Sequence, residues 1–144
     1  LDATRPAALT ELLKDADCGV RYWGVMGIHM RGRERVLAGR HALRECLKDS
    51  SPDVAIAAAE ALITFGEETD RDESLKLLIQ RANWNENSVF VVMAALNSLD
   101  MIGDKTVSVA AAIRELPTKG SAPDARYDSY VPRLIKDLED KFGK

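Results

Sequence analysis

The segment LKDSSPDVAIAAAEALITFG, residues 47–66, repeats an earlier part of the chain. A shift of 34 residues superimposes five identical residues, so that Leu13, Lys14, Asp15, Val20 and Gly32 fall on Leu47, Lys48, Asp49, Val54 and Gly66. A third, looser copy places Val89 35 residues after Val54. Repeats of this length are typical of stacked supersecondary units, each too small to bury its own apolar face.

Each copy has the pattern of a helix. Apolar residues follow the spacing i, i+3, i+4, i+7, i+8, i+11 in the second copy, at Val54, Ala57, Ala58, Ala61, Leu62 and Phe65. Ser51 is a favourable N-cap and Pro52 a favourable first helical residue. Gly66 is expected to end the helix in the left-handed conformation. We therefore predict that the residues of this copy specify both the start and the end of its helix.

The whole chain is predicted to be all-α, with about eight helices and no sheet. The expected helices lie near 5–15, 18–31, 33–48, 52–65, 71–83, 87–102, 104–116 and 128–142. Asp17, Asp70 and Asp104 are plausible helix caps. The run VFVV at 89–92 has strand character but no second alternating run to pair with. The pattern predicts a short α-α superhelix of HEAT or armadillo-like repeats.

We predict a single helical-repeat domain over residues 1–144. The segment LPTKGSAPDARYDSYVPR, residues 116–133, interrupts the pattern with three prolines and a glycine. Residues 117–127 are expected to form a non-repeat loop before a last, capping helix. That end of the chain could serve as a cap on the apolar face of the final repeat or as a binding loop.

The charge balance bears on possible partners. The net charge is −3, 46% of the 144 residues are hydrophobic and the pI is near 5.4. A global cationic field of the kind that attracts nucleic acid or anionic membrane is therefore not expected, and neither is predicted as a partner. Because the sequence begins at Leu1 rather than Met, we expect a fragment or processed product.

The residues that could carry chemistry are few and scattered. Cys18 and Cys46 lie fourteen residues on either side of Gly32, which permits a disulfide in a helical hairpin. We favour two small buried hydrophobes, because spacing alone does not show that the Cβ atoms face each other. We predict free thiols. His29 and His41 lack neighbours at metal-ligand spacing. No metal site, cofactor site or catalytic residue is predicted, since no GxSxG, Walker, GxGxxG or HExxH motif occurs.

Arginines gather on the predicted third helix. Arg33, Arg40 and Arg44 project within a narrow arc, and Arg31 and Arg35 flank its start. One interpretation is a solvated face partly paired with Glu34 and Glu45. The other is a docking patch for phosphate, sulfate or carboxylate, which the forked guanidinium donors suit.

A tryptophan surrounded by asparagines occupies a predicted helix junction. The stretch ANWNENSVF, residues 82–90, places Trp84 among Asn83, Asn85 and Asn87. Trp84 could simply fill the gap between repeats. Alternatively, an aromatic ring flanked by amides is typical of a carbohydrate or protein contact.

Three stretches together resemble a known family: VRYWGVMGIHMRG, ANWNENSVFVVMAALNSLDMIG and LPTKGSAPDARYDSYVPRLIKDL. They are similar to the C-terminal HEAT-like region of exported bacterial sulfatases of the formylglycine-dependent arylsulfatase and heparan N-sulfatase-like group. The likeness covers roughly residues 9–138. It implies a periplasmic or secreted parent, whose catalytic domain carries a Cys-x-Pro-x-Arg motif and a calcium-type ion. Neither cysteine here is in such a motif, so no catalytic residue transfers.

The resemblance therefore implies a non-catalytic accessory domain that packs on the sulfatase catalytic domain of the same parent chain. A sulfated glycan is a second possible partner. The candidate interaction surface consists of Arg21, Trp84, Asn85, Asn87, Arg126 and Tyr127. The alternative is an independent HEAT-like adaptor, or a helical enzyme of phycobilin-lyase-like or DNA-glycosylase-like type. The acidic pI counts against the DNA-binding version.

Overall fold

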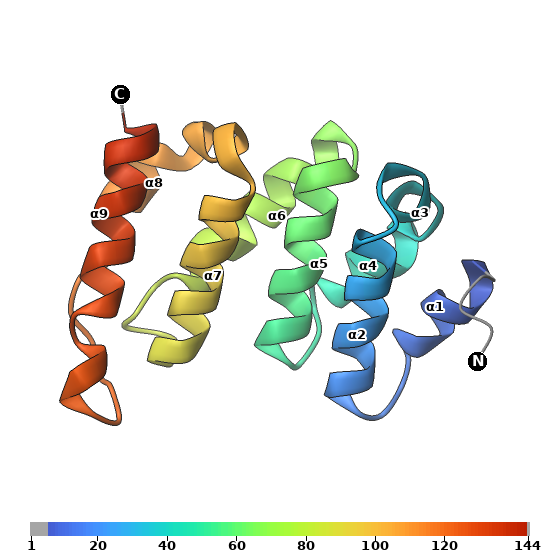
Figure 1. Cartoon of the computed structure of the whole chain (residues 1–144), viewed down its shortest axis with the longest axis horizontal. Helices are drawn as coiled ribbons and strands as arrows, with labels where there is room; N and C mark the ends of the chain where they lie inside the picture. Colours follow the sequence, from blue (N-terminus) through green and yellow to red (C-terminus); the bar gives the residue numbers. More distant parts are fainter. Residues whose placement is uncertain (1–5, 144) are drawn as a thin grey trace. The chain divides into compact units, whose positions relative to one another are not determined.

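The computed structural model describes residues 6–143, which form nine α-helices and two 3-10 segments without a strand (Figure 1). The elements are α1 (Pro6–Leu12), α2 (Cys18–His29), α3 (Arg33–Ala38), α4 (Arg40–Cys46), α5 (Pro52–Phe65), α6 (Glu68–Arg81), α7 (Val89–Met101), η1 (Gly103–Val109), α8 (Ala110–Arg114), η2 (Ala125–Tyr127) and α9 (Tyr130–Phe142). The chain divides within α6, between Ser74 and Leu75, into two compact units. Among residues 6–143, no helix is both long and apolar enough to cross a membrane.

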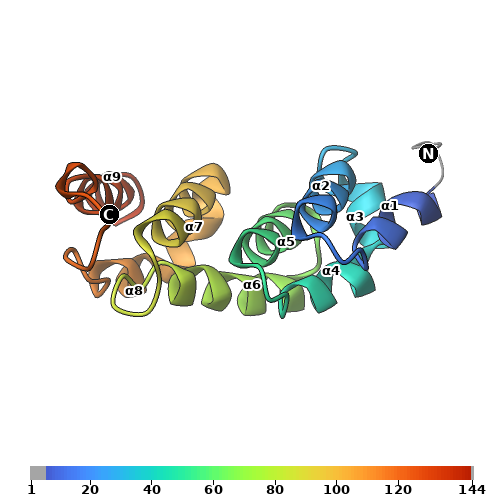
Figure 2. The ribbon, with the colours of Figure 1, turned by 90° about the horizontal axis from the view of Figure 1, so that it is seen from below.

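Unit 1 is built around α5. This helix packs beside α2, and α3 and α4 contact it from a second layer (Figure 2). Most of its side chains are therefore buried, including Val54, Ala58 and Leu62, which explains why its apolar residues extend beyond one face. The helix that the repeat predicts at 52–65 is confirmed, with Pro52 in its first turn.

Small residues bring α1 close to α2. An added Cβ at Gly24 would lie 2.9 Å from Cδ2 of Leu13, and one at Gly27 would lie 3.0 Å from Cδ2 of Leu9. Both distances are shorter than an ordinary van der Waals contact, so a larger residue at either position would require the leucine side chain to shift. The glycines are thus explained by helix packing.

Two predicted helices are interrupted. The segment 33–48 breaks at Gly39, which ends α3 and precedes α4. The segment 104–116 begins as the 3-10 helix η1 and becomes α-helical only at Ala110. Buried Thr106 donates its hydroxyl proton to the carbonyl oxygen of Leu99 at 2.5 Å, which holds η1 against the end of α7.

The cap predictions have mixed outcomes. Asp17 caps α2, since its Oδ1 accepts the N–H of Gly19 at 2.7 Å. Asp70 and Asp104 are not N-cap residues, because they lie inside the first turns of α6 and η1, although Asp70 does accept the backbone N–H of Glu67, the residue before α6, at 3.0 Å. Gly66 is extended, with φ −73° and ψ −168°, so the predicted left-handed conformation is wrong. Gly32 has φ 78° and does adopt a positive φ, which favours glycine.

In unit 2, α7 and α9 lie side by side and α8 packs against α9 (Figure 2). Their contact buries apolar residues of all three helices, namely Val92, Leu96, Leu99, Ile113, Val131, Ile135 and Leu138. The strand-like run at 89–92 starts α7. Nζ of Lys141 lies 2.5 Å from Oδ1 of Asp100, which ties the end of α9 to the end of α7.

The two cysteines are free, as predicted. Cys46 is buried, and burial raises the pKa of its thiol to about 11. Cys18 is exposed at the start of α2, so its interpretation as a buried hydrophobe is wrong. The difference follows from position, because Cys18 starts its helix at the end of a loop whereas Cys46 is on the inner face of α4.

Candidate interaction surface

Three aromatic rings meet at the surface of unit 2. Phe90, in the first turn of α7, contacts Tyr127 edge-to-face, with ring centroids 5.1 Å apart. Tyr130, the first residue of α9, lies 6.2 Å from Tyr127 between centroids. Phe90 is 54% exposed and Tyr130 is 45% exposed. Together with Arg126 they form what we call the aromatic patch.

Arg126 lies over this patch. Its guanidinium carbon is 4.9 Å from the centroid of the Tyr127 ring, and Nη2 donates to the Tyr127 hydroxyl at 3.0 Å. The short η2 turn places it there, because Oδ1 of Asp124 accepts the Arg126 backbone N–H at 2.9 Å. The guanidinium itself is 3.9 Å from Asp124 and mostly exposed. It therefore keeps donor capacity for a partner.

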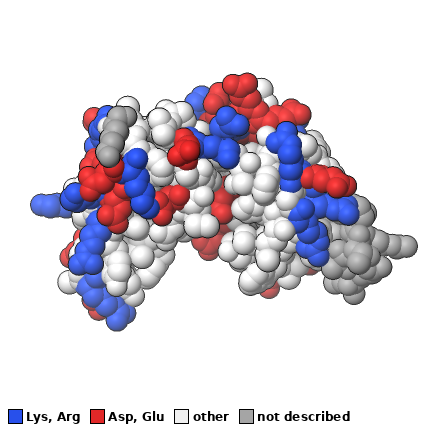
Figure 3. Space-filling model, turned by 45° about the horizontal axis from the view of Figure 1, so that its top comes forward, with Lys and Arg blue, Asp and Glu red and all other residues white. Residues whose placement is uncertain are grey.

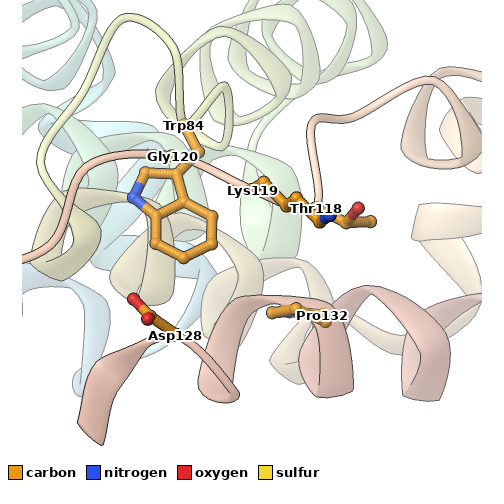
Figure 4. Close-up of a pocket in the computed structure, with 6 residues that line it drawn as sticks. All are labelled: Trp84, Thr118, Lys119, Gly120, Asp128 and Pro132. Atoms are coloured by element: carbon orange, nitrogen blue, oxygen red, sulfur yellow. The ribbon is translucent and has the colours of Figure 1, made fainter. Parts of the chain in front are cut away.

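Trp84 is buried beneath residues 118–123. Only 3% of its surface is exposed, and its indole N–H donates to the carbonyl oxygen of Ser121 at 3.1 Å. Gly120 lies against the ring, since an added Cβ would be 2.4 Å from the indole Cγ (Figure 4). A cavity of about 340 Å³ adjoins the indole, with Lys119, Asp128 and Pro132 among its lining residues.

The asparagines around Trp84 have structural partners. Oδ1 of Asn83 accepts the backbone N–H of Asn85 at 3.1 Å. Nδ2 of Asn87 donates to the carbonyl oxygens of Gln80 and Asn83, at 2.9 and 3.1 Å. These bonds close the turn between α6 and α7. Asn85 is exposed and lines a second cavity of about 540 Å³, which extends from Trp84 to Phe90.

Arg21 is committed to an ion pair within unit 1. Its Nε and Nη2 each donate to the Asp49 carboxylate at 2.7 Å, and Nη1 donates to the carbonyl oxygens of Asp15 and Ala16. Asp49 also accepts the N–H of Ser51 at 2.8 Å. The hydrogen bonds from Arg21 hold the pKa of Asp49 below its ordinary value. The contact of Arg21 with a partner stays a prediction.

The arginines of α4 form ion pairs with acidic residues in the first turns of α6. Nε of Arg40 donates to Asp70 at 2.6 Å, Nη1 of Arg44 donates to Asp70 at 2.7 Å, and Nη2 of Arg44 donates to Glu73 at 2.9 Å. The expected pairing with Glu34 and Glu45 is therefore wrong for these two arginines, because acids near the start of α6 take that role. Burial alone would raise the pKa of Asp70, but its hydrogen bonds outweigh burial and lower it.

The aromatic patch brings together some of the predicted residues but not all. Arg126 and Tyr127 belong to it, and Asn85 lies on the adjoining cavity. Phe90 and Tyr130 were not predicted. A signal for Phe90 exists in the sequence, because residue 90 falls outside the series of buried positions of α7, which are Val89, Val92, Ala95, Leu96, Ser98 and Leu99. Tyr130 adjoins a loop and carries no such signal.

Among the described residues, no group of three His, Cys, Asp or Glu side chains is placed to hold a metal ion. Nδ1 of His29 lies 3.9 Å from Glu60, and its ring contacts Phe65 edge-to-face. On the face drawn in Figure 3, acidic and basic side chains lie next to one another.

These features define an α-helical repeat protein with an exposed aromatic and cationic surface. The sequence profile of HEAT repeats matches residues 6–89 and, in a second overlapping match, residues 41–131. The chain belongs to the HEAT repeat family. No curated protein and no solved structure shows significant similarity to it. HEAT repeats commonly mediate protein interaction and are typically non-catalytic.

Proposed function

We propose that this chain is a non-catalytic interaction domain whose aromatic patch contacts another protein domain. The observation that carries the proposal is the exposure of Phe90, Tyr130 and Arg126 at one place on unit 2. Aromatic residues and arginine dominate the energetics of protein interfaces, since they combine large apolar area with directed hydrogen bonds. The edge-to-face contact between Phe90 and Tyr127 also restricts these two rings before binding, which lowers the entropy cost of association.

The partner that we propose is the catalytic domain of a sulfatase in the same parent chain. The resemblance to sulfatase C-terminal regions rests on three stretches, and two of them meet in unit 2. The ANWNENSVF stretch supplies Trp84 and Phe90, and the PDARY loop supplies Arg126 and Tyr127. Their contact supports a shared surface. A sulfated glycan bound by the parent would be a second ligand for the exposed guanidinium of Arg126.

The sulfatase parent is tested by the coding sequence upstream of Leu1. We expect a Cys-x-Pro-x-Arg motif in the same reading frame, with carboxylates for a calcium-type ion. A complete reading frame without that motif would exclude the sulfatase parent. The interaction domain itself would remain, in the role of an independent adaptor.

The interface is tested with Tyr130→Ala and Arg126→Ala in the full-length parent. We expect each change to weaken domain contact by roughly 1–2 kcal/mol, because exposed aromatic and arginine anchors have effects of that size. The melting temperature of the parent should fall by a few degrees, and turnover of 4-methylumbelliferyl sulfate should decrease. Met101→Ala is the matched control, since Met101 is exposed at the opposite end of α7.

The same variants in residues 1–144 alone separate binding from folding. Their stability should stay close to that of the unchanged chain, because the Arg126 side chain is largely exposed and Tyr130 is nearly half exposed. Equal losses of stability in the isolated chain and in the parent would indicate that Arg126 and Tyr130 have a structural role within this domain. No loss in either would show that the aromatic patch is not an interface.

A further inference from the structure

Residues 117–124, which we call the strap, run between α8 and η2 and cross Trp84 (Figure 4). The crossing is made by two neighbouring residues. Gly120 lies against the indole ring, and Ser121 accepts the indole N–H through its carbonyl oxygen. A buried, hydrogen-bonded indole is thus covered by a short irregular segment and not by a helix.

The strap has few other attachments. Within residues 117–123, no backbone group takes part in a backbone hydrogen bond with the described chain. The bond from Trp84 to Ser121 is the single hydrogen bond that ties these residues to the rest of residues 6–143. Residues 118–121 are exposed. Opening of the strap would therefore break one hydrogen bond, the contact with the indole and the packing of half-buried Pro117 and Ala122, whereas opening of α7 would also break the backbone hydrogen bonds of a helix.

Two cavities meet the strap on either side of this crossing. Residues 118–120 line the cavity of about 340 Å³, and residues 121–123 line the cavity of about 540 Å³. Trp84 lines both. The indole therefore lines both spaces, and consecutive residues of the strap line one space and then the other.

We propose that the strap is a gate over Trp84, which opens while the helices of unit 2 stay folded. Opening joins the two cavities into one groove, with the indole as its wall. Phe90 belongs both to the aromatic patch and to the lining of the larger cavity, so the opened groove continues from that patch. In the closed state Trp84 contributes packing. In the open state it presents a large aromatic surface and a free N–H donor.

The gate is tested through the indole N–H of Trp84, observed by NMR in the Trp23→Phe chain, where it is the single indole signal. We expect the protection factor of this indole N–H against hydrogen exchange to be at least about tenfold lower than those of the slowest backbone amides of α7, such as Leu96 and Leu99. Equal protection of the indole and these amides would overturn the proposal, because Trp84 would then be exposed only by global unfolding.

Two strap variants test which contact with Trp84 keeps the strap closed. Gly120→Ala places a methyl group against the indole, so it should accelerate indole exchange while the α7 amides keep their rates. Ser121→Ala is the matched control, since it retains the backbone carbonyl that accepts the indole N–H. A parallel loss of protection at the indole and in α7, or no change with Gly120→Ala, would show that the strap is not a gate. The result does not depend on any sulfatase partner.

Discussion

Replacement of Trp84 with alanine is expected to lower the free energy of unfolding by about 3–5 kcal/mol, the range for large buried aromatic residues. The indole is almost entirely buried between the strap and the rest of unit 2, so the change leaves a cavity beside two existing ones. The hydrogen bond to Ser121 is lost as well. Urea titration followed by circular dichroism at 222 nm measures the effect.

Trp23→Ala is the control for this prediction. Trp23 is 67% exposed on α2, so its removal should cost no more than about 0.5–1 kcal/mol. Trp84→Phe separates ring packing from hydrogen bonding, and we expect a loss of about 1–2 kcal/mol because a smaller ring without an N–H remains. Similar small effects at both tryptophans would contradict the buried role of Trp84.

The helices of this fold could be predicted because they depend on local pattern. The apolar series from Val54 to Phe65 and the starting Pro52 define α5 without knowledge of its neighbours. The break at Gly39 could not be predicted, since a glycine within a helical pattern is often tolerated. The 3-10 form of η1 could not be predicted either, because it accompanies a tertiary hydrogen bond from Thr106 to Leu99 at the end of α7.

The candidate surface was only partly predictable for a different reason. The Asn-Trp junction and the proline-rich loop at 116–133 are both recognisable sequence motifs, but the hydrogen bond between them joins Trp84 to Ser121, 37 positions away. A sequence without its fold does not show such pairing. The same limit explains Arg40 and Arg44. The acidic residues close to them in sequence are Glu34 and Glu45. In the fold, however, they pair with Asp70, which is 30 residues from Arg40 and 26 residues from Arg44.

Asp70→Asn is expected to lower the free energy of unfolding by about 2–3 kcal/mol. The Asp70 side chain is fully buried, and its carboxylate receives hydrogen bonds from Arg40, Arg44 and the N–H of Glu67. Loss of one partner of a fully buried ion pair costs roughly 3–5 kcal/mol. We expect less here, because the two arginines are about one third exposed and can regain water. Urea titration at pH 7 measures the loss.

Glu73→Gln is the control for the Asp70 prediction. Glu73 pairs with Arg44 at 2.9 Å, but its side chain is 46% exposed. Exposed pairs contribute roughly 0–1 kcal/mol, so this variant should remain close to the original chain in stability. Equal losses for Asp70→Asn and Glu73→Gln would show that burial does not distinguish the two carboxylates.

The pH dependence of the Asp70→Asn effect follows from the lowered pKa of Asp70 in the folded chain. At acid pH the unfolded chain binds this proton more readily than the folded chain, so stability from the carboxylate is lost as pH falls. The contribution of the Asp70 carboxylate to stability is complete well above the ordinary aspartate pKa of about 3.9. It declines as the pH falls toward the lower pKa of Asp70 in the folded chain. The difference in stability between the original chain and Asp70→Asn should therefore be constant from about pH 6 to 8 and shrink toward pH 3. Asp49 is present in both chains, so each keeps some acid sensitivity. A difference that stays constant or widens in acid would show that the Asp70 carboxylate does not stabilise the fold through its charge.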